Sequence, residues 1–126
     1  MDILCDTSFL IILVSAPIKQ AERIEIHFGK LNFLVPDIVI DELKHLEKKA
    51  GPKRSKLAST AIEVSYSKLK IVKIFKSHHV DNSLIEYAAS HGCAIATIDR
   101  DLRMQSIANN IPVITFSGNK LSVAAL

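Results

Sequence analysis

MDILCDTSFLIIL (residues 1–13) opens with an apolar stretch that ends on a carboxylate, Asp6, and continues with Thr7, Ser8 and a second apolar run. A first strand this hydrophobic indicates the centre of a parallel sheet, buried on both faces. Open α/β sheets bind their ligands at the carboxyl ends of the strands, where Asp6 is expected. We therefore hypothesise that Asp6 is the first member of an acidic, metal-binding cluster.

The composition indicates a single globular domain. The chain has 126 residues, of which 48% are hydrophobic and 23% charged, and this length suffices for a substantial core. No apolar run reaches the roughly 18 residues of a membrane-spanning helix. Because no basic region or cleavage site marks a signal peptide, we expect a cytoplasmic protein. Cys5 and Cys93 are expected at opposite ends of neighbouring strands and are interpreted as buried thiols rather than a disulfide.

Strands and helices alternate along the chain, which predicts a parallel sheet joined by right-handed crossovers. After the first strand, the expected strands cover residues 32–35, 70–75, 93–98 and 112–116. The expected helices cover residues 7–16, 18–28, 37–49, 54–68, 81–91 and 100–109. The predicted domain spans residues 1–117, and residues 118–126 follow it as a C-terminal tail of undetermined structure.

Three further carboxylates occupy positions that a shared site would require. Glu42 falls on the apolar stripe of its helix, where a core residue is expected, although an edge glutamate that reaches water is the alternative. Asp81 begins a helix after the third strand, so a purely structural N-cap is the competing interpretation. Asp99 ends the second wholly apolar strand, as Asp6 ends the first, and it too would suit a helix cap.

These four carboxylates predict a bound cation. Four carboxylates placed close together cannot all stay ionised without compensating positive charge. Oxygen-only ligands favour Mg²⁺ or Mn²⁺, which can activate water and stabilise the charge of an in-line displacement at phosphorus. The sequence lacks the glycine-rich loop of nucleotide hydrolases and the elbow motif of serine or cysteine nucleophiles. Metal-dependent hydrolysis of a phosphodiester is therefore the favoured chemistry.

Positive charge is concentrated in one segment of the chain. The net charge is +3, and the excess lies between residues 44 and 56. One interpretation is a solvated helix face; the other is contact with a phosphate backbone. The second interpretation assigns RNA binding to Lys48, Lys49, Lys53 and Arg54.

The chain resembles the PIN-domain ribonucleases at four short stretches: DTSFL (6–10), PDIVIDEL (36–43), VDNSLIEYA (80–88) and ATIDRDLR (96–103). The combination covers most of the chain in the family's order. The resemblance implies a three-layer α/β/α sandwich with a central parallel five-stranded sheet, and an endoribonuclease that depends on Mg²⁺ or Mn²⁺. It also implies acidic metal-binding residues at Asp6, Glu42, Asp81 and Asp99. The accessory residues that it implies are Asp101, Thr97 and Ser8.

Within the family, the TIDRDLR run (97–103) is more similar to the branch that processes ribosomal RNA precursors than to toxins of toxin–antitoxin pairs, and both branches remain open. The implied partners are an RNA substrate, a second copy of the chain, and an antitoxin or a ribosome-assembly factor, with no membrane. The alternative from another class is a catalytically inactive RNA-binding or assembly module that retains the PIN fold. A phospho-receiver domain is disfavoured, because the expected third strand lacks a terminal Asp and the fifth a terminal Lys.

Overall fold

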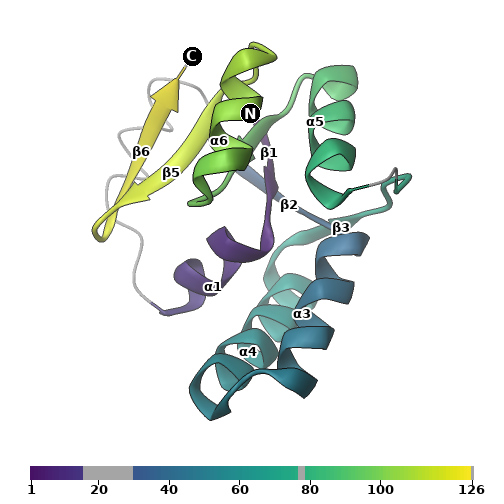
Figure 1. Ribbon diagram of the computed structural model, residues 1–126, viewed down its shortest axis with the longest axis vertical. Helices are drawn as coiled ribbons and strands as arrows, with labels where there is room; N and C mark the ends of the chain where they lie inside the picture. Colours follow the sequence, from purple (N-terminus) through teal and green to yellow (C-terminus); the bar gives the residue numbers. More distant parts are fainter. Residues whose placement is uncertain (16–29, 77–78, 126) are drawn as a thin grey trace.

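The computed structural model describes residues 1–15, 30–76 and 79–125 of the chain. Helices separate the successive strands from β1 to β5, as the sequence predicts, and Figure 1 shows the elements. They are β1 (Asp2–Cys5), α1 (Thr7–Ser15), β2 (Asn32–Pro36), α3 (Asp37–Lys49), α4 (Pro52–Lys68), β3 (Lys70–Val72), α5 (Val80–His91), β4 (Ala94–Ala96), α6 (Arg100–Ala108), β5 (Val113–Ser117) and β6 (Lys120–Ala125). The helix expected over residues 18–28 lies outside the described residues.

The described strands form one mixed sheet in the order β3-β2-β1-β4-β5-β6. Strands β1 to β5 run parallel, whereas β6 pairs antiparallel with β5. The expectation of five strands, all parallel, is therefore wrong by one strand. Residues 118–126, expected as a tail, contain β6, which follows a turn at Gly118 and Asn119. Gly118 has a φ of 64°, and this left-handed conformation is the one that a glycine adopts without strain.

The centre of the sheet is the pair β1 and β4. Ile3 pairs with Ala94 and Leu4 with Ile95, and the side chains of Ile3, Leu4 and Ile95 are completely buried. The backbone N–H of Asp6 donates to the carbonyl of Ala96 at 3.1 Å, which continues the ladder past the end of β1. The carboxyl ends of these two strands therefore lie side by side, as the two apolar runs predict.

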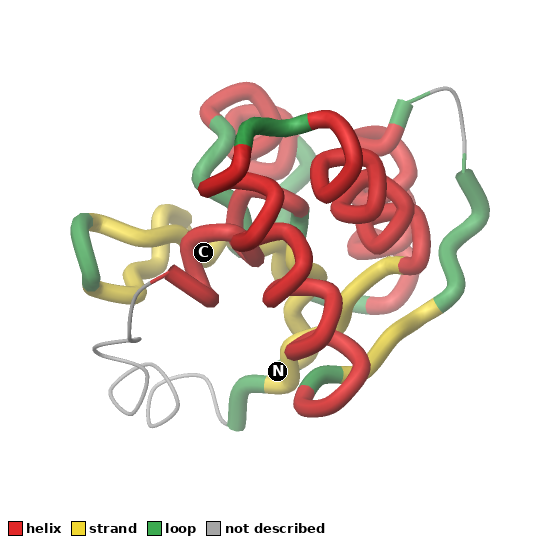
Figure 2. The backbone as a smooth tube through the Cα atoms, turned by 90° about the horizontal axis from the view of Figure 1, so that it is seen from below, coloured by secondary structure: helices red, strands yellow, loops and turns green. Residues whose placement is uncertain are grey.

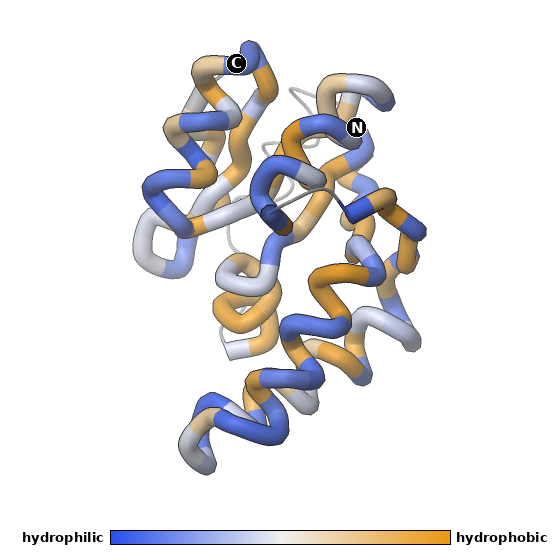
Figure 3. The backbone as a smooth tube through the Cα atoms, turned by 45° about the vertical axis from the view of Figure 1, so that its right-hand side comes forward, coloured by the Kyte–Doolittle hydropathy of each residue, from blue (hydrophilic) through white to orange (hydrophobic). Residues whose placement is uncertain are grey.

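Helices cover both faces of the sheet. The main helix contacts group α1 with α3 and α4, and α5 with α6, and Figure 2 shows the strands running between helices. Figure 3 shows α1 as an almost wholly hydrophobic helix, in contrast to the mixed surface of the α3–α4 hairpin. Phe9 of α1 stacks on Phe116 with ring centroids 4.9 Å apart. These layers give the α/β sandwich expected from the alternating pattern.

Several local signals in the sequence set the element boundaries. Pro36 precedes α3 in extended conformation, and Gly92 ends α5 with a left-handed φ of 66°. Cys5 and Cys93 are buried free thiols, as predicted. Among the described residues, no helix combines the length and the apolar character needed to cross a membrane.

Candidate active site

Asp6 lies directly after β1, and hydrogen bonds from three residues hold its carboxylate. The backbone N–H of Phe9 donates to Oδ1 at 2.8 Å. The Ser8 hydroxyl lies 2.8 Å from Oδ1 and 3.0 Å from Oδ2, and the Thr97 hydroxyl donates to Oδ2. The side chain is only 8% exposed. The carboxylate therefore has a fixed position at the edge of the sheet.

The two hydroxyls that bind Asp6 are themselves oriented by the backbone after β4. The N–H of Asp99 donates to Thr97 Oγ1 at 2.9 Å, and the N–H of Ile98 donates to Ser8 Oγ at 3.2 Å. Each hydroxyl oxygen thus accepts a backbone proton and directs its own proton towards Asp6. Thr97 and Ser8, which the resemblance implies as accessory residues, thus join the ends of β1 and β4.

The position of Asp6 makes its ionisation costly. The pKa of Asp6 is raised to about 6: burial is the largest cause and the charge of Asp81 adds to it, while the hydrogen bonds from Thr97, Phe9 and Ser8 oppose the shift. An ionised carboxylate in such a place is stabilised by a nearby positive charge.

Asp81 lies in the first turn of α5, where the charges of three other acids act on its carboxylate. Burial raises its pKa, and the charges of Asp99, Glu42 and Asp101 raise it further, in that order, while His79 opposes them. The N-cap position of α5 is His79, and no side chain caps the helix there. Asp81 is therefore not the N-cap of α5, in contrast to the alternative interpretation from the sequence.

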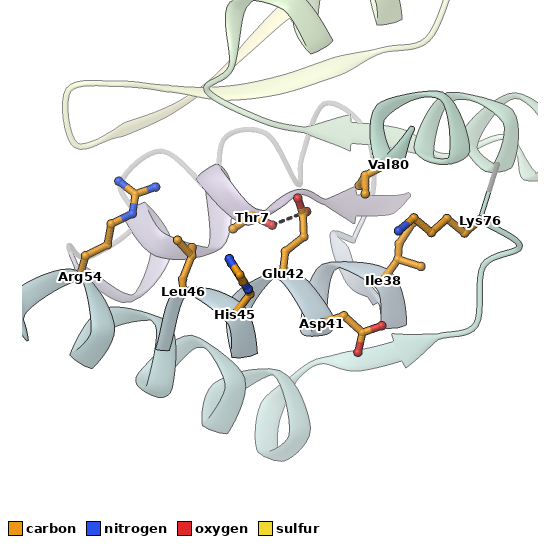
Figure 4. Close-up of a pocket in the computed structure, with 9 residues that line it drawn as sticks. All are labelled: Thr7, Ile38, Asp41, Glu42, His45, Leu46, Arg54, Lys76 and Val80. Carbon is orange, nitrogen blue, oxygen red and sulfur yellow. Dashed lines mark hydrogen bonds between the residues drawn. The ribbon is translucent and has the colours of Figure 1, made fainter. Parts of the chain in front are cut away.

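Glu42 lies on the surface of α3, so the expectation that it occupies a core position is wrong. The residues of α3 that are buried are Ile38, Val39, Ile40 and Leu43. Glu42 Oε1 instead accepts a hydrogen bond of 2.8 Å from the hydroxyl of Thr7, as Figure 4 shows. This bond ties α3 to the start of α1, one residue after Asp6. Sequence reasoning did not assign Thr7 to the site, although its place beside Asp6 was a usable signal.

Asp99 does act as a helix cap. Its Oδ1 accepts hydrogen bonds from the backbone N–H groups of Asp101 at 2.8 Å and of Leu102 at 3.2 Å. Asp99 is exposed, as is Asp101 in the first turn of α6. Asp99 therefore combines a structural role with a charge that acts on Asp81.

The predicted carboxylates interact through their charges but are not arranged as a preformed ligand set. Within residues 1–15, 30–76 and 79–125, no three His, Cys, Asp or Glu side chains are close enough together to hold a metal ion. The donor chemistry nevertheless suits a hard cation, because all four predicted ligands offer carboxylate oxygens. Glu42 and Asp99 are exposed, so their side chains have room to adjust.

Two neighbouring cavities meet at Glu42. One, of about 460 Å³, is lined in part by Thr7, Glu42, His45, Arg54 and Lys76, which Figure 4 shows as sticks. The other, of about 360 Å³, is lined by Glu42, His79, Val80, Asp81, Asn82 and Gln105. The first cavity carries mixed charge, because Asp41 and Glu42 line it together with Arg54 and Lys76. It adjoins an acidic cavity that contains Glu42 and Asp81.

The structure separates the four predicted RNA-binding residues. Arg54 lines the mixed-charge cavity, whereas Lys48, Lys49 and Lys53 are exposed at the turn between α3 and α4. Figure 1 shows this turn at the end of the hairpin that points away from the sheet. Lys76, which sequence reasoning did not select, lines the mixed-charge cavity together with Arg54.

Known structures share this architecture. The structure of the PIN domain endonuclease Utp24 matches with a TM-score of 0.74 and 21% identity, over 99% of this chain and 92% of that one. A domain of a functionally unknown protein from Methanocaldococcus jannaschii matches with a TM-score of 0.63 and 15% identity, over 99% and 97%. PAE2754 from Pyrobaculum aerophilum matches with a TM-score of 0.50 and 22% identity, over 81% and 77%.

The sequence itself also identifies the family. No curated protein sequence matches the chain with significance. The model of the PIN-like domain family, in contrast, matches residues 3–119, which is nearly the whole chain. With its sheet and its acidic edge, the chain belongs to the family of PIN-like domains.

Proposed function

We propose that the chain is an endoribonuclease that hydrolyses RNA phosphodiester bonds with a divalent metal ion. The observation that carries this proposal is the electrostatic coupling of carboxylates at one edge of the sheet. Asp81 raises the pKa of Asp6, and Asp99 and Glu42 raise the pKa of Asp81. Negative charge gathered in this way is typical of a site that binds a cation.

The proposed metal is Mg²⁺ or Mn²⁺, held by Asp6, Glu42, Asp81 and Asp99. When bound, such an ion supplies an activated water and neutralises charge that develops on the phosphate oxygens. Within the chain, Thr97 and Ser8 keep the Asp6 carboxylate in one orientation through their hydroxyl protons. Asp101 adds negative charge beside Asp81, which favours retention of the cation.

The proposed substrate is RNA, and the cavities suit its backbone. Arg54 and Lys76 line the cavity on one side of Glu42 and offer positive charge to phosphates. The exposed lysines of the α3–α4 turn, Lys48, Lys49 and Lys53, extend this charge outward. Both roles that the sequence leaves open, ribosomal RNA processing and toxin-type cleavage, would use this chemistry. An antitoxin or an assembly factor would bind as a partner in the respective case.

The test is cleavage of end-labelled RNA by the purified full chain with Mg²⁺, with Mn²⁺, and with EDTA. We expect cleavage with either metal and none with EDTA or with Asp6→Asn. Glu63→Gln, which removes an exposed carboxylate from α4, is the control and should cleave at the wild-type rate. Cleavage by Asp6→Asn at the wild-type rate would refute the site. RNA binding without cleavage under any metal condition would support the inactive RNA-binding module instead.

A further inference from the structure

The edge of the sheet formed by β3 carries four lysines in nine residues. Strand β3 is the terminal strand of the described sheet, and no acid occurs between residues 64 and 80. Lys68, Lys70, Lys73 and Lys76 are all exposed. We call residues 68–76 the β3 edge. Figure 2 shows β3 and the segment after it on the outside of the molecule, at the right of the view.

Phe75 in the β3 edge is unusually exposed. Its side chain is 89% accessible, whereas the other exposed large hydrophobic residues among those described range from 39% to 61%. An aromatic ring normally buries much of its surface, so this ring is available for stacking. The ring lies at a cavity of about 190 Å³ that Tyr87 and His91 also line. The rings of Tyr87 and His91 are themselves stacked, with centroids 3.9 Å apart.

The β3 edge connects two larger cavities. At its start, Lys68, Lys70 and Lys30 line a cavity of about 630 Å³ at the amino ends of the strands. At its end, Lys76 lines the mixed-charge cavity that also contains Arg54 and Glu42. The seven residues from Lys70 to Lys76 span at most about 20 Å. A polyanion along this edge would therefore reach the acidic site.

Several carboxylates face this path and limit what can bind there. Asp37 Oδ1 accepts a hydrogen bond of 3.0 Å from the N–H of Ile74, and Asp41 and Glu42 line the cavity at the end of the β3 edge. Asp2 lines the cavity at the start of the β3 edge, and Glu86 lines the cavity of Phe75. Glu86 offers an acceptor for the amino group of a base, as carboxylates do in direct base recognition. A ligand with phosphates and bases would use all three features of the β3 edge: the lysines, the exposed ring of Phe75 and the acceptor oxygens of Glu86. Pairing with another β-strand accounts for none of them, because edge lysines oppose such pairing.

We propose that the β3 edge binds a single-stranded segment of the RNA substrate, with Phe75 stacking on an unpaired base and Lys70, Lys73 and Lys76 contacting phosphates. This inference rests on the proposed function, since it assumes that the ligand is RNA. It adds a preference: an unpaired base exposes the ring face on which Phe75 can stack, whereas a paired base does not. The enzyme would therefore favour substrates with a single-stranded segment beside the cleaved bond.

Binding without metal tests the stacking role of Phe75. The full chain is titrated, in EDTA, with labelled oligouridine RNA and with a blunt RNA duplex. Phe75→Ala should weaken oligouridine binding about tenfold and leave duplex binding unchanged. Tyr66→Ala is the matched control, because Tyr66 is an aromatic residue of α4 that is 61% exposed. It should leave both affinities unchanged.

A fluorescent variant gives a direct reading of the same contact. The sequence contains no tryptophan, so Phe75→Trp introduces a single one. Oligouridine should quench its fluorescence, and the duplex should not. Fluorescence that does not change while oligouridine binds would overturn the proposal.

The salt dependence of binding tests the lysines. Replacing Lys70, Lys73 and Lys76 with glutamine should reduce the slope of log affinity against log salt by about 2, since each phosphate contact with single strands contributes about 0.7. Lys73→Gln alone is compared with Lys120→Gln, which lies in β6 at the opposite edge of the sheet. Only the former should reduce the slope. Equal slopes for the two variants would overturn the proposal.

The outcomes separate this proposal from the nuclease activity. Loss of oligouridine binding in Phe75→Ala, in a chain that fails to cleave RNA with metal, would support the β3 edge and refute the enzyme. Metal-dependent cleavage with an unchanged oligouridine affinity in Phe75→Ala would refute the β3 edge alone. If Phe75→Ala instead dissociates a dimer and leaves RNA affinity unchanged, the exposed ring belongs to a protein interface and the proposal is wrong.

Discussion

The carboxylates on the two sides of the candidate site differ in burial and in the number of hydrogen bonds that they accept. On the sheet side, Asp6 is buried and accepts hydrogen bonds from Ser8, Phe9 and Thr97. On the helix side, Glu42 is exposed and accepts one bond from Thr7, and Asp81 is partly buried. The difference shows that the sheet provides a fixed anchor, whereas α3 and α5 bring charges that can adjust. Adjustable carboxylates around one fixed carboxylate would suit the proposed metal site, whose geometry would then be completed when a cation binds.

The largest effect on RNA cleavage is expected from replacing Asp6, the fixed anchor. Asp6→Asn keeps the shape of the side chain but removes its charge, so RNA cleavage with Mn²⁺ should fall by at least about 100-fold. Glu42→Gln, on the adjustable side, should cost less, because the neighbouring acids can compensate in part. Cleavage rates at saturating Mn²⁺ measure both. A larger loss for Glu42→Gln than for Asp6→Asn would reverse the proposed roles of the two sides.

The next largest effect is expected from the hydroxyl that orients the anchor. Thr97→Val has nearly the same volume but cannot donate to Asp6 or accept from the N–H of Asp99. We expect cleavage to fall by about 10- to 100-fold, as for other residues that orient metal ligands. Thr97→Ser retains the hydroxyl and should restore most of the rate. Equal rates for the two variants would show that packing, and not the hydroxyl, matters at this position.

The buried charge of Asp6 also makes stability depend on pH. Its pKa is about 6 in the folded chain against a usual 3.8, so the folded state holds the proton more tightly. This contribution to stability is complete below pH 3.8 and is lost as the pH rises through 6. Without metal, the free energy of unfolding should fall by on the order of 2 kcal/mol between pH 4 and 7 through Asp6. Asp6→Asn should remove this loss and be the more stable protein at pH 7.

Urea unfolding in EDTA at several pH values measures this effect. Glu63→Gln is the control and should follow the wild-type pH dependence. Addition of Mg²⁺ or Mn²⁺ should stabilise the wild type at pH 7 more than Asp6→Asn, because the ion binds the ionised carboxylates. If Asp6→Asn is less stable than the wild type at pH 7, the buried carboxylate is compensated by its hydrogen bonds alone.

The smallest effect is expected at the contact between α1 and α3. Thr7→Val removes the hydrogen bond to Glu42 at an exposed position, so the free energy of unfolding should fall by less than about 1 kcal/mol. Cleavage should fall only a few-fold, since Glu42 keeps its charge. Thr60→Val on α4, which removes a bond from a hydroxyl to its own helix, is the control for stability. A loss of cleavage as large as that of Asp6→Asn would show that Glu42 is also an anchor.

The sequence predicted the sheet side of the site better than the helix side. Two wholly apolar strands are a strong signal for the centre of a parallel sheet, and β1 and β4 are indeed neighbours with Asp6 and Asp99 beyond their ends. Glu42 was placed wrongly, because helical periodicity shows which residues share a face but not where the buried face ends. The structure places Glu42 beside Thr7, a contact between residues 35 positions apart that periodicity cannot indicate.

The sixth strand was missed for a different reason. The turn at Gly118 and Asn119 is a usual two-residue hairpin connection, but the run after it, with Ser122 and two alanines, is only weakly typical of a strand. Pairing with β5 forms the strand in spite of its weak propensity. The catalytic and metal-binding roles of the four carboxylates remain predictions that the experiments above test.

The double use of Asp99 has a practical consequence for mutational scanning. One of its carboxylate oxygens caps α6 by accepting hydrogen bonds from the N–H groups of Asp101 and Leu102. An alanine there would destabilise the first helical turn and also remove a charge. An inactive Asp99→Ala protein would therefore say little about chemistry. Asparagine starts helices as well as aspartate does, so Asp99→Asn is the substitution that separates the electrostatic contribution from the scaffold.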